Sequence, residues 1–206
     1  MKGNHLLSGR AVVVCYLVAF WSGFFVMGVE LLGGRLLAPN FGSSVYVWGA
    51  LITIFMLALS LGYLAGGRFS QRNPSMAKLG MLLAAAALTT LPVLPLSGVT
   101  LEDLAIAIPD PRFGSLAAAA MLFFVPTFFG GMVSPYCVRL LVDSEESSGR
   151  RAGQLYFVST FGSAAGTILT SFYLVLWLEL NTILIAMIAI SCVLATLAGA
   201  IKGNKT

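Results

Sequence analysis

The sequence contains little charge for its length. Only 10% of its 206 residues are Asp, Glu, Lys or Arg, whereas 58% are hydrophobic, and the mean hydropathy is +0.93. A soluble domain carries about a quarter charged residues, because water must wet its surface. The composition therefore excludes an ordinary soluble domain and predicts a protein that lies within a lipid bilayer.

Residues that bind metals or carry out catalysis are also scarce. His5 is the one histidine and lies in the N-terminal tail, which excludes a haem held by two histidines inside the membrane. Cys15, Cys137 and Cys192 lie in apolar runs without metal-binding spacing, so we interpret them as small hydrophobic residues. No phosphate-binding loop, dinucleotide fingerprint, HExxH or CxxC motif occurs. We expect no cofactor, no metal site and no enzymatic activity.

What the sequence does contain is a series of long uncharged runs. A helix needs about 20 apolar residues to cross the hydrocarbon core of a bilayer. Residues 38–44 include proline, asparagine, glycine and two serines, which predicts a loop that divides one overlong run. The runs then predict six transmembrane helices, near residues 11–35, 45–69, 76–97, 114–141, 152–178 and 181–201.

The basic residues alternate between the two sides of this arrangement. With the N-terminus in the cytoplasm, only Arg35 and Arg112 lie on the external side, and the segment 99–113 there is acidic. Ten basic residues lie on the cytoplasmic side, as the positive-inside rule requires: Lys2, Arg10, Arg68, Arg72, Lys78, Arg139, Arg150, Arg151, Lys202 and Lys205. They are scattered singly, which argues against a nucleic-acid partner. We predict a multi-pass protein of a bacterial inner membrane, with both termini cytoplasmic.

The sequence also resembles itself at a shift of 104 residues. Residues 35–62 and 139–166 align without a gap and share 8 of 28 positions, where the composition alone would give about two or three. Three helices per unit make the second unit enter the membrane from the opposite side, as in many secondary transporters. We predict one all-α domain over 1–206, with repeats at about 11–98 and 114–201 joined by an external loop at 99–113. This 3+3 inverted repeat resembles half of a major-facilitator fold.

Glu30 is the acid placed deepest in a predicted span. A carboxylate in hydrocarbon costs at least a few kcal/mol, so it should face the protein and have a partner. Arg35 follows after five residues, about 140° away around a regular helix, so pairing requires the helix to unwind at Gly33 and Gly34. Two interpretations stay open: a site at which Glu30 receives a cationic group, and a structural ion pair.

Further candidates flank these residues. Tyr46 and Trp48 follow, and their rings suit either an ammonium group or, as we favour, the aromatic belt of the membrane interface. In the fourth predicted helix, prolines and paired glycines predict a second interruption, with Ser134, Tyr136 and Arg139 beside it. Two interrupted helices at matching places in two repeats are typical of a transporter binding site.

Glycines spaced four residues apart indicate helix packing. Gly62 and Gly66 in the second predicted helix, and Gly162 and Gly166 in the fifth, would let helix backbones approach closely. The fifth helix is also rich in hydroxyl groups, which is compatible with a polar lining, although such groups also bond back to their own helix. Its hydroxyl residues are Ser159, Thr160, Ser163, Thr167, Thr170 and Ser171.

Five stretches carry a resemblance to a known family. They are residues 30–49 (ELLGGRLLAPNFGSSVYVWG), 61–68 (LGYLAGGR), 131–140 (GMVSPYCVRL), 153–156 (GQLY) and 159–167 (STFGSAAGT). Together they resemble the N-terminal membrane domain of bacterial fused spermidine-synthase-like proteins, also called fused major-facilitator/spermidine synthases. In that family a soluble aminopropyltransferase-like domain often follows the membrane helices. Its glycine-rich cofactor loop and acidic residues do not occur here, so the resemblance implies the fold and not the catalysis.

Two functions are consistent with these patterns. The first is a transporter-like protein that handles a small amine-bearing or polar solute near Glu30 and Arg35, with a homo-oligomer or a membrane or soluble partner protein completing the pathway. The second is a non-catalytic membrane subunit that anchors or stabilises a larger enzyme or electron-transfer complex.

The predicted topology is testable with single cysteines in a cysteine-free background. Lys78→Cys is expected to react with a membrane-impermeant maleimide only after the cells are opened, because it lies at the cytoplasmic end of the third predicted helix. Glu102→Cys is expected to react in intact cells. Labelling of both positions from the same side would contradict the topology.

Overall fold

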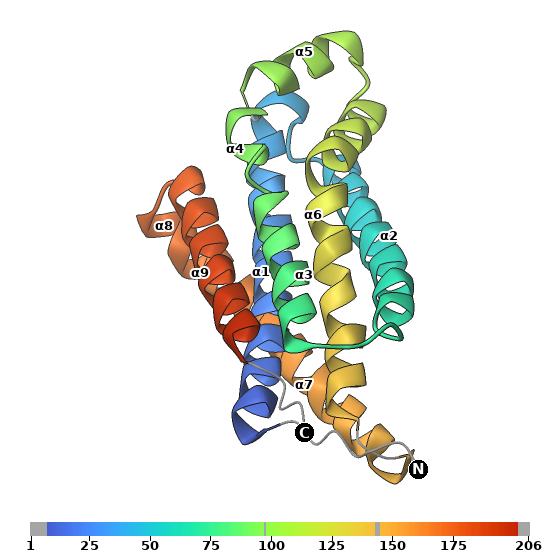
Figure 1. The fold of residues 1–206 in the computed structure, drawn as a ribbon. Helices are drawn as coiled ribbons and strands as arrows, with labels where there is room; N and C mark the ends of the chain where they lie inside the picture. The colour runs from blue at the N-terminus through green and yellow to red at the C-terminus, as the bar shows by residue number, and fades with distance from the viewer. Residues whose placement is uncertain (1–7, 97, 143–144, 202–206) are drawn as a thin grey trace.

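The computed structural model describes residues 8–96, 98–142 and 145–201, and within them it contains helices and no strand (Figure 1). Six segments of the described chain are long and apolar enough to cross a membrane: Gly9–Phe41, Val45–Phe69, Met76–Pro95, Pro111–Leu141, Ser147–Trp177 and Leu180–Ala200. The prediction of an all-helical chain with six such segments is confirmed.

Four spans are single helices and two are composite. The single helices are α1 (Gly9–Phe41), α2 (Val45–Phe69), α6 (Pro111–Leu141) and α9 (Leu180–Ala200). The third span consists of α3 (Met76–Leu88), a turn and α4 (Val93–Leu96). The fifth consists of α7 (Glu145–Leu169), the π-helix η1 (Thr170–Leu174) and α8 (Val175–Trp177). The short helix α5 (Val99–Ala107) occupies the predicted external segment.

The first helix is longer than the sequence indicated. Instead of a loop over residues 38–44, α1 continues through Pro39 to Phe41 and ends at Gly42. Burial favours the extra turn, because Phe41 is buried and its ring lies against Gly114. Gly42 then has φ 78°, and its N–H donates to the Ala38 carbonyl at 2.9 Å, which closes the helix end.

Helices α1 and α6 lie side by side at the centre of the bundle (Figure 1). Helix α2 packs mainly on α6, and α7 packs mainly on α1. Helix α3 packs on α9 and α6. In the described chain α2 and α7 therefore rest on the two central helices and not extensively on each other.

Two glycines of α2 bring its backbone into direct contact with α6. A Cβ added at Gly62 would collide with the backbone of Phe128, and one added at Gly66 would collide with the backbone of Met132. Only glycine fits at these two positions without moving a helix. Within lipid, helices associate through such close van der Waals packing, because lipid tails are as apolar as the side chains.

Two glycines of α7 make the equivalent contact with α1. A Cβ added at Gly162 would collide with the backbone of Phe20, and one added at Gly166 would collide with the backbone of Phe24. The prediction that these glycine pairs are helix-packing positions agrees with the contacts of all four residues. Each outer helix is therefore attached to its own central helix by one glycine pair.

Polar side chains between the central helices satisfy one another or the backbone. Trp21 Nε1 donates to Ser191 Oγ at 2.7 Å and ties α1 to α9. Ser22 Oγ donates to the Gly130 carbonyl of α6 at 3.2 Å. The thiols of Cys15 and Cys137 each point at the other residue's carbonyl, at 3.9 and 3.8 Å. Each bond removes a polar cost that hydrocarbon would otherwise impose.

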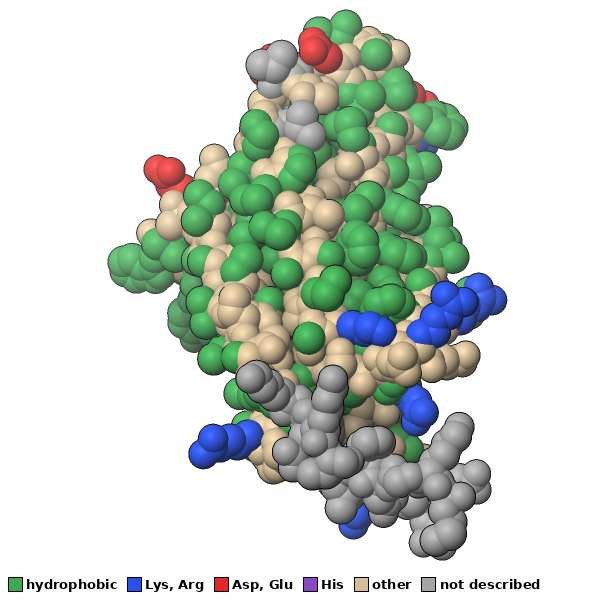
Figure 2. Space-filling view, in the orientation of Figure 1, with side chains coloured by type: hydrophobic (Ala, Val, Ile, Leu, Met, Phe, Trp, Pro, Cys, Tyr) green, Lys and Arg blue, Asp and Glu red, His purple; other side chains and the backbone are tan. Residues whose placement is uncertain are grey.

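Charges separate between the two ends of the bundle. On the face drawn in Figure 2, most Lys and Arg side chains lie at the lower end, and Asp and Glu lie at the upper end. Among the described residues, one ion pair forms, between Arg112 and Asp110 at 2.7 Å. The side-chain hydrogen bond from Arg112 holds the pKa of Asp110 below its usual range. The pair is exposed, so it contributes little to stability.

Two glycines of α2 make a matched test of this packing. Gly62→Ala places a Cβ against the α6 backbone and is expected to lower the free energy of unfolding in detergent by about 1–3 kcal/mol. Gly67→Ala meets no atom within 4 Å and is expected to be neutral or to stabilise by about 0.5–1 kcal/mol. The melting temperatures of both variants are measured by thermal unfolding. Equal melting temperatures would contradict the close packing of α2 on α6 at Gly62.

Candidate functional site

Glu30 lies on one face of α1 together with two glycines. Gly23 is seven residues before it and Gly34 four residues after it, which are spacings that share a helix face. Gly23 lies against Ser159 and Ser163 of α7, and Gly34 lies against the Trp48 ring of α2. Glu30, which is partly buried, therefore occupies the side of α1 between α2 and α7. We call this side of α1, defined by Gly23, Glu30 and Gly34, the Glu30 face.

Of the two interpretations left open for Glu30, the structural ion pair with Arg35 does not form among the described residues. Helix α1 stays regular past both residues, which leaves their side chains about 140° apart around the axis. Arg35 is exposed, and its Nη1 donates to the Val175 carbonyl at 3.3 Å. That carbonyl is in the last turn of the fifth span, where helix carbonyls lack partners within the helix. No described residue forms an ion pair or a hydrogen bond with the Glu30 carboxylate.

Gly33 and Gly34 make room for neighbouring side chains, and α1 does not unwind there, as pairing of Glu30 with Arg35 would have required. A Cβ at Gly33 would lie 3.0 Å from the Phe123 ring and 3.2 Å from Leu51. A Cβ at Gly34 would lie 2.6 Å from the Trp48 ring. The glycine pair therefore lets α2 and α6 approach α1 beside Glu30.

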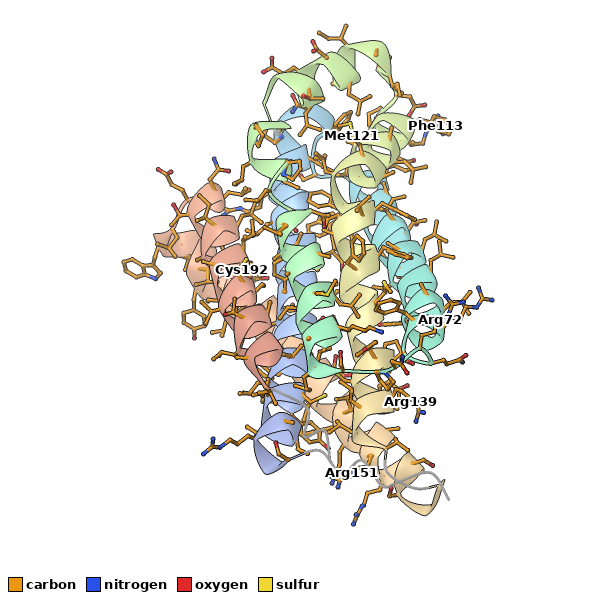
Figure 3. The ribbon with its side chains drawn as sticks, in the orientation of Figure 1. Arg72, Phe113, Met121, Arg139, Arg151 and Cys192 are labelled. Carbon is orange, nitrogen blue, oxygen red and sulfur yellow. The ribbon has the colours of Figure 1, made fainter. Side chains whose placement is uncertain are left out.

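The predicted interruption of the fourth span is also absent, since α6 runs unbroken from Pro111 to Leu141. Its three candidate residues, Ser134, Tyr136 and Arg139, lie in three different environments. Ser134 Oγ lies 3.4 Å from Ser159 Oγ of α7. Tyr136 is buried, and its hydroxyl accepts a hydrogen bond from the Ser75 N–H at 3.0 Å, which fixes the start of α3. Arg139 is exposed at the basic end of the bundle (Figure 3).

The two aromatic candidates of α2 separate as well. Trp48 packs on Gly34 and so borders the Glu30 face. Tyr46 lies in the first turn of α2 and is 57% exposed. Of the sequence candidates, the structure places Glu30 and Trp48 near one another, and it places Arg35, Tyr46, Tyr136 and Arg139 elsewhere.

The irregular backbone lies instead in the fifth span, at the π-helix η1. Its first residue, Thr170, is fully buried, and its hydroxyl has no hydrogen-bond partner among the described residues. A Cβ at Gly28 of α1 would lie 3.2 Å from that hydroxyl oxygen, so η1 sits against α1 just before Glu30. Single π-turns are frequent at functional sites. The sequence signal for this element is the cluster of hydroxyl residues in the fifth predicted helix.

The hydroxyl groups of α7 beside α1 present acceptors. Ser163 Oγ donates to the Ser159 carbonyl at 3.2 Å, and Thr167 Oγ1 donates to the Ser163 carbonyl at 3.0 Å. Each hydroxyl has one proton, and here that proton is used within the helix. The oxygen lone pairs that remain are acceptors, which suit a ligand that carries several N–H donors.

The described residues contain no cluster of three or more His, Cys, Asp or Glu side chains that could hold a metal ion. Comparisons of the chain with models of protein families, with curated proteins and with solved structures returned no match.

Proposed function

We propose that this chain is a transporter-like membrane protein in which Glu30 binds the ammonium group of a small amine-bearing solute. The observation that carries the proposal is the position of Glu30. It is an acid within a membrane-spanning helix, partly buried, and no described cation lies within ion-pair distance of it. Ionisable residues at such a position are costly and are retained for a function.

The surroundings of Glu30 support an amine as the ligand. An ammonium group supplies the positive charge that Arg35 does not. Its N–H donors also suit a hydroxyl acceptor such as Ser163 Oγ, which lies against Gly23 on the Glu30 face, two helical turns before the carboxylate. The Trp48 ring packs on Gly34, one helical turn after Glu30, and adds an aromatic surface to the Glu30 face. Aromatic rings attract cations through their electron-rich faces.

The packing of the two halves supports the inverted repeat that such a transporter would have. Gly62 contacts Phe128. The repeat shift of 104 residues maps Gly62 onto Gly166 and Phe128 onto Phe24, and these two residues are also in contact. In the same way, the contact of Gly66 with Met132 corresponds to that of Thr170 with Gly28. A two-fold relation between the halves accounts for both coincidences.

The same proposal places the protein in a bacterial inner membrane with its basic end in the cytoplasm. The segregation of charge seen in Figure 2 supports this orientation, because positively charged segments are retained on the cytoplasmic side. The resemblance to the membrane domain of fused spermidine-synthase-like proteins is consistent with it and with an amine solute.

Uptake into liposomes tests the proposed function. Purified protein is reconstituted and assayed with radiolabelled polyamines and amino acids. Glu30→Gln is expected to reduce amine flux at least ten-fold, because the neutral amide removes the charge that holds the ammonium group. Glu179→Gln, which neutralises an exposed acid outside the spans, is the matched control and should retain flux. Absence of flux with every solute, or equal flux in both variants, would contradict the proposal.

A second candidate, the non-catalytic membrane subunit, is favoured by the outer surface of α2. Gly49 and Gly67 meet no atom within 4 Å, although glycine inside a helix costs about 0.5–1 kcal/mol relative to alanine. A helix of a partner protein packed on these positions would explain them.

Purification in a mild detergent separates the two candidates. A subunit is expected to co-purify with one partner at fixed stoichiometry, and Gly49→Leu or Gly67→Leu should release that partner, because the added side chain prevents close helix packing. Isolation of the wild-type chain free of other proteins would contradict the subunit function.

A further inference from the structure

A pocket of about 490 Å³ opens between α1 and α7 at the basic end of the bundle. It is lined by Tyr16, Arg151, Gly153, Gln154, Phe157 and Val158. Figure 3 shows Arg151 at the same end as Arg72 and Arg139. Tyr16 lies 14 residues before Glu30, or about 21 Å along the helix axis, so the pocket is separate from the Glu30 site.

The pocket has a polar part and an apolar part. Arg151 and Gln154 supply N–H donors, and the Tyr16 hydroxyl donates to Gln154 Oε1 at 3.2 Å, which holds the amide in place. Phe157 and Val158 form the apolar wall. Arg150, next to Arg151 in the chain and exposed, adds a second positive charge to this end of the bundle.

An apolar surface leads from the pocket along the outside of the bundle. Phe157 is 70% exposed, and its ring stacks on that of Phe161 with centroids 6.1 Å apart. The Phe161 ring in turn lies 6.3 Å from that of Phe20 on α1. These three aromatic rings follow α7 and α1 from the basic end toward the middle of the membrane.

We infer that this pocket binds the headgroup of an anionic phospholipid, with an acyl chain lying along Phe157 and Phe161. A phosphate group is an acceptor with negative charge, which matches the guanidinium of Arg151 and the amide of Gln154. Basic pockets between membrane helices on the cytoplasmic side recognise such headgroups. The exposed aromatic rings fit the attached hydrocarbon, which a free phosphate ion lacks.

Native mass spectrometry of the detergent-solubilised full chain tests the inference. Phosphatidylglycerol and phosphatidylcholine of identical acyl chains are titrated separately, so that only the headgroup differs. The wild-type protein is expected to retain phosphatidylglycerol at least five-fold more strongly, and millimolar inorganic phosphate should not displace it. Equal retention of the two lipids, or displacement by phosphate, would overturn the inference.

Substitutions inside and outside the pocket locate the site. Arg151→Gln should reduce retention of phosphatidylglycerol about five-fold, the effect of one positive charge at the membrane surface, whereas Arg151→Lys should keep most of it. Arg72→Gln removes a charge at the same end but outside the pocket and should leave retention unchanged. Equal losses in Arg72→Gln and Arg151→Gln would show a diffuse electrostatic effect and overturn the site. If Arg151→Gln does not fold, Phe157→Ala gives the same test, with shortened retention expected and unchanged retention contradicting the site.

Discussion

The bundle depends on the close approach of helix backbones at glycine. In lipid there is no hydrophobic driving force between helices, so stability comes from the van der Waals contact that small residues permit. Gly62 and Gly66 bring α2 onto α6, and Gly162 and Gly166 bring α7 onto α1. Since α2 and α7 rest on the central pair and hardly on each other, these contacts determine where both outer helices lie and which side of α1 stays between them.

Within that frame, most buried polar groups find partners. Trp21 bonds to Ser191, Ser22 bonds to a carbonyl of α6, and the two central cysteines bond to each other's backbone. Against this background the Glu30 carboxylate and the Thr170 hydroxyl differ, since no described residue pairs with either. The carboxylate lies on the Glu30 face, whereas Thr170 packs against Gly28, about 160° away around α1. The proposed solute site therefore follows from the unpaired charge of Glu30.

The sequence predicted the spans better than it predicted their irregularities. Hydrophobic length and the positions of charges depend on the bilayer alone, so they can be read from one chain. A glycine pair inside a helix, in contrast, is compatible either with a break in the helix or with close packing against a neighbouring helix. Gly33 and Gly34 were compatible with a break, yet the ring of Trp48 and the side chains of Phe123 and Leu51 fill the space they leave, and α1 stays helical.

What the sequence determined by itself was therefore the helical class, the number of membrane-spanning segments and the candidate acid Glu30, because each follows from hydropathy and charge along the chain. The tertiary structure decided which groups meet. It turned Arg35 toward the Val175 carbonyl, put Tyr136 on the start of α3, and placed the π-helix at Thr170 beside Gly28. These outcomes depend on packing between helices far apart in sequence, which no local pattern contains.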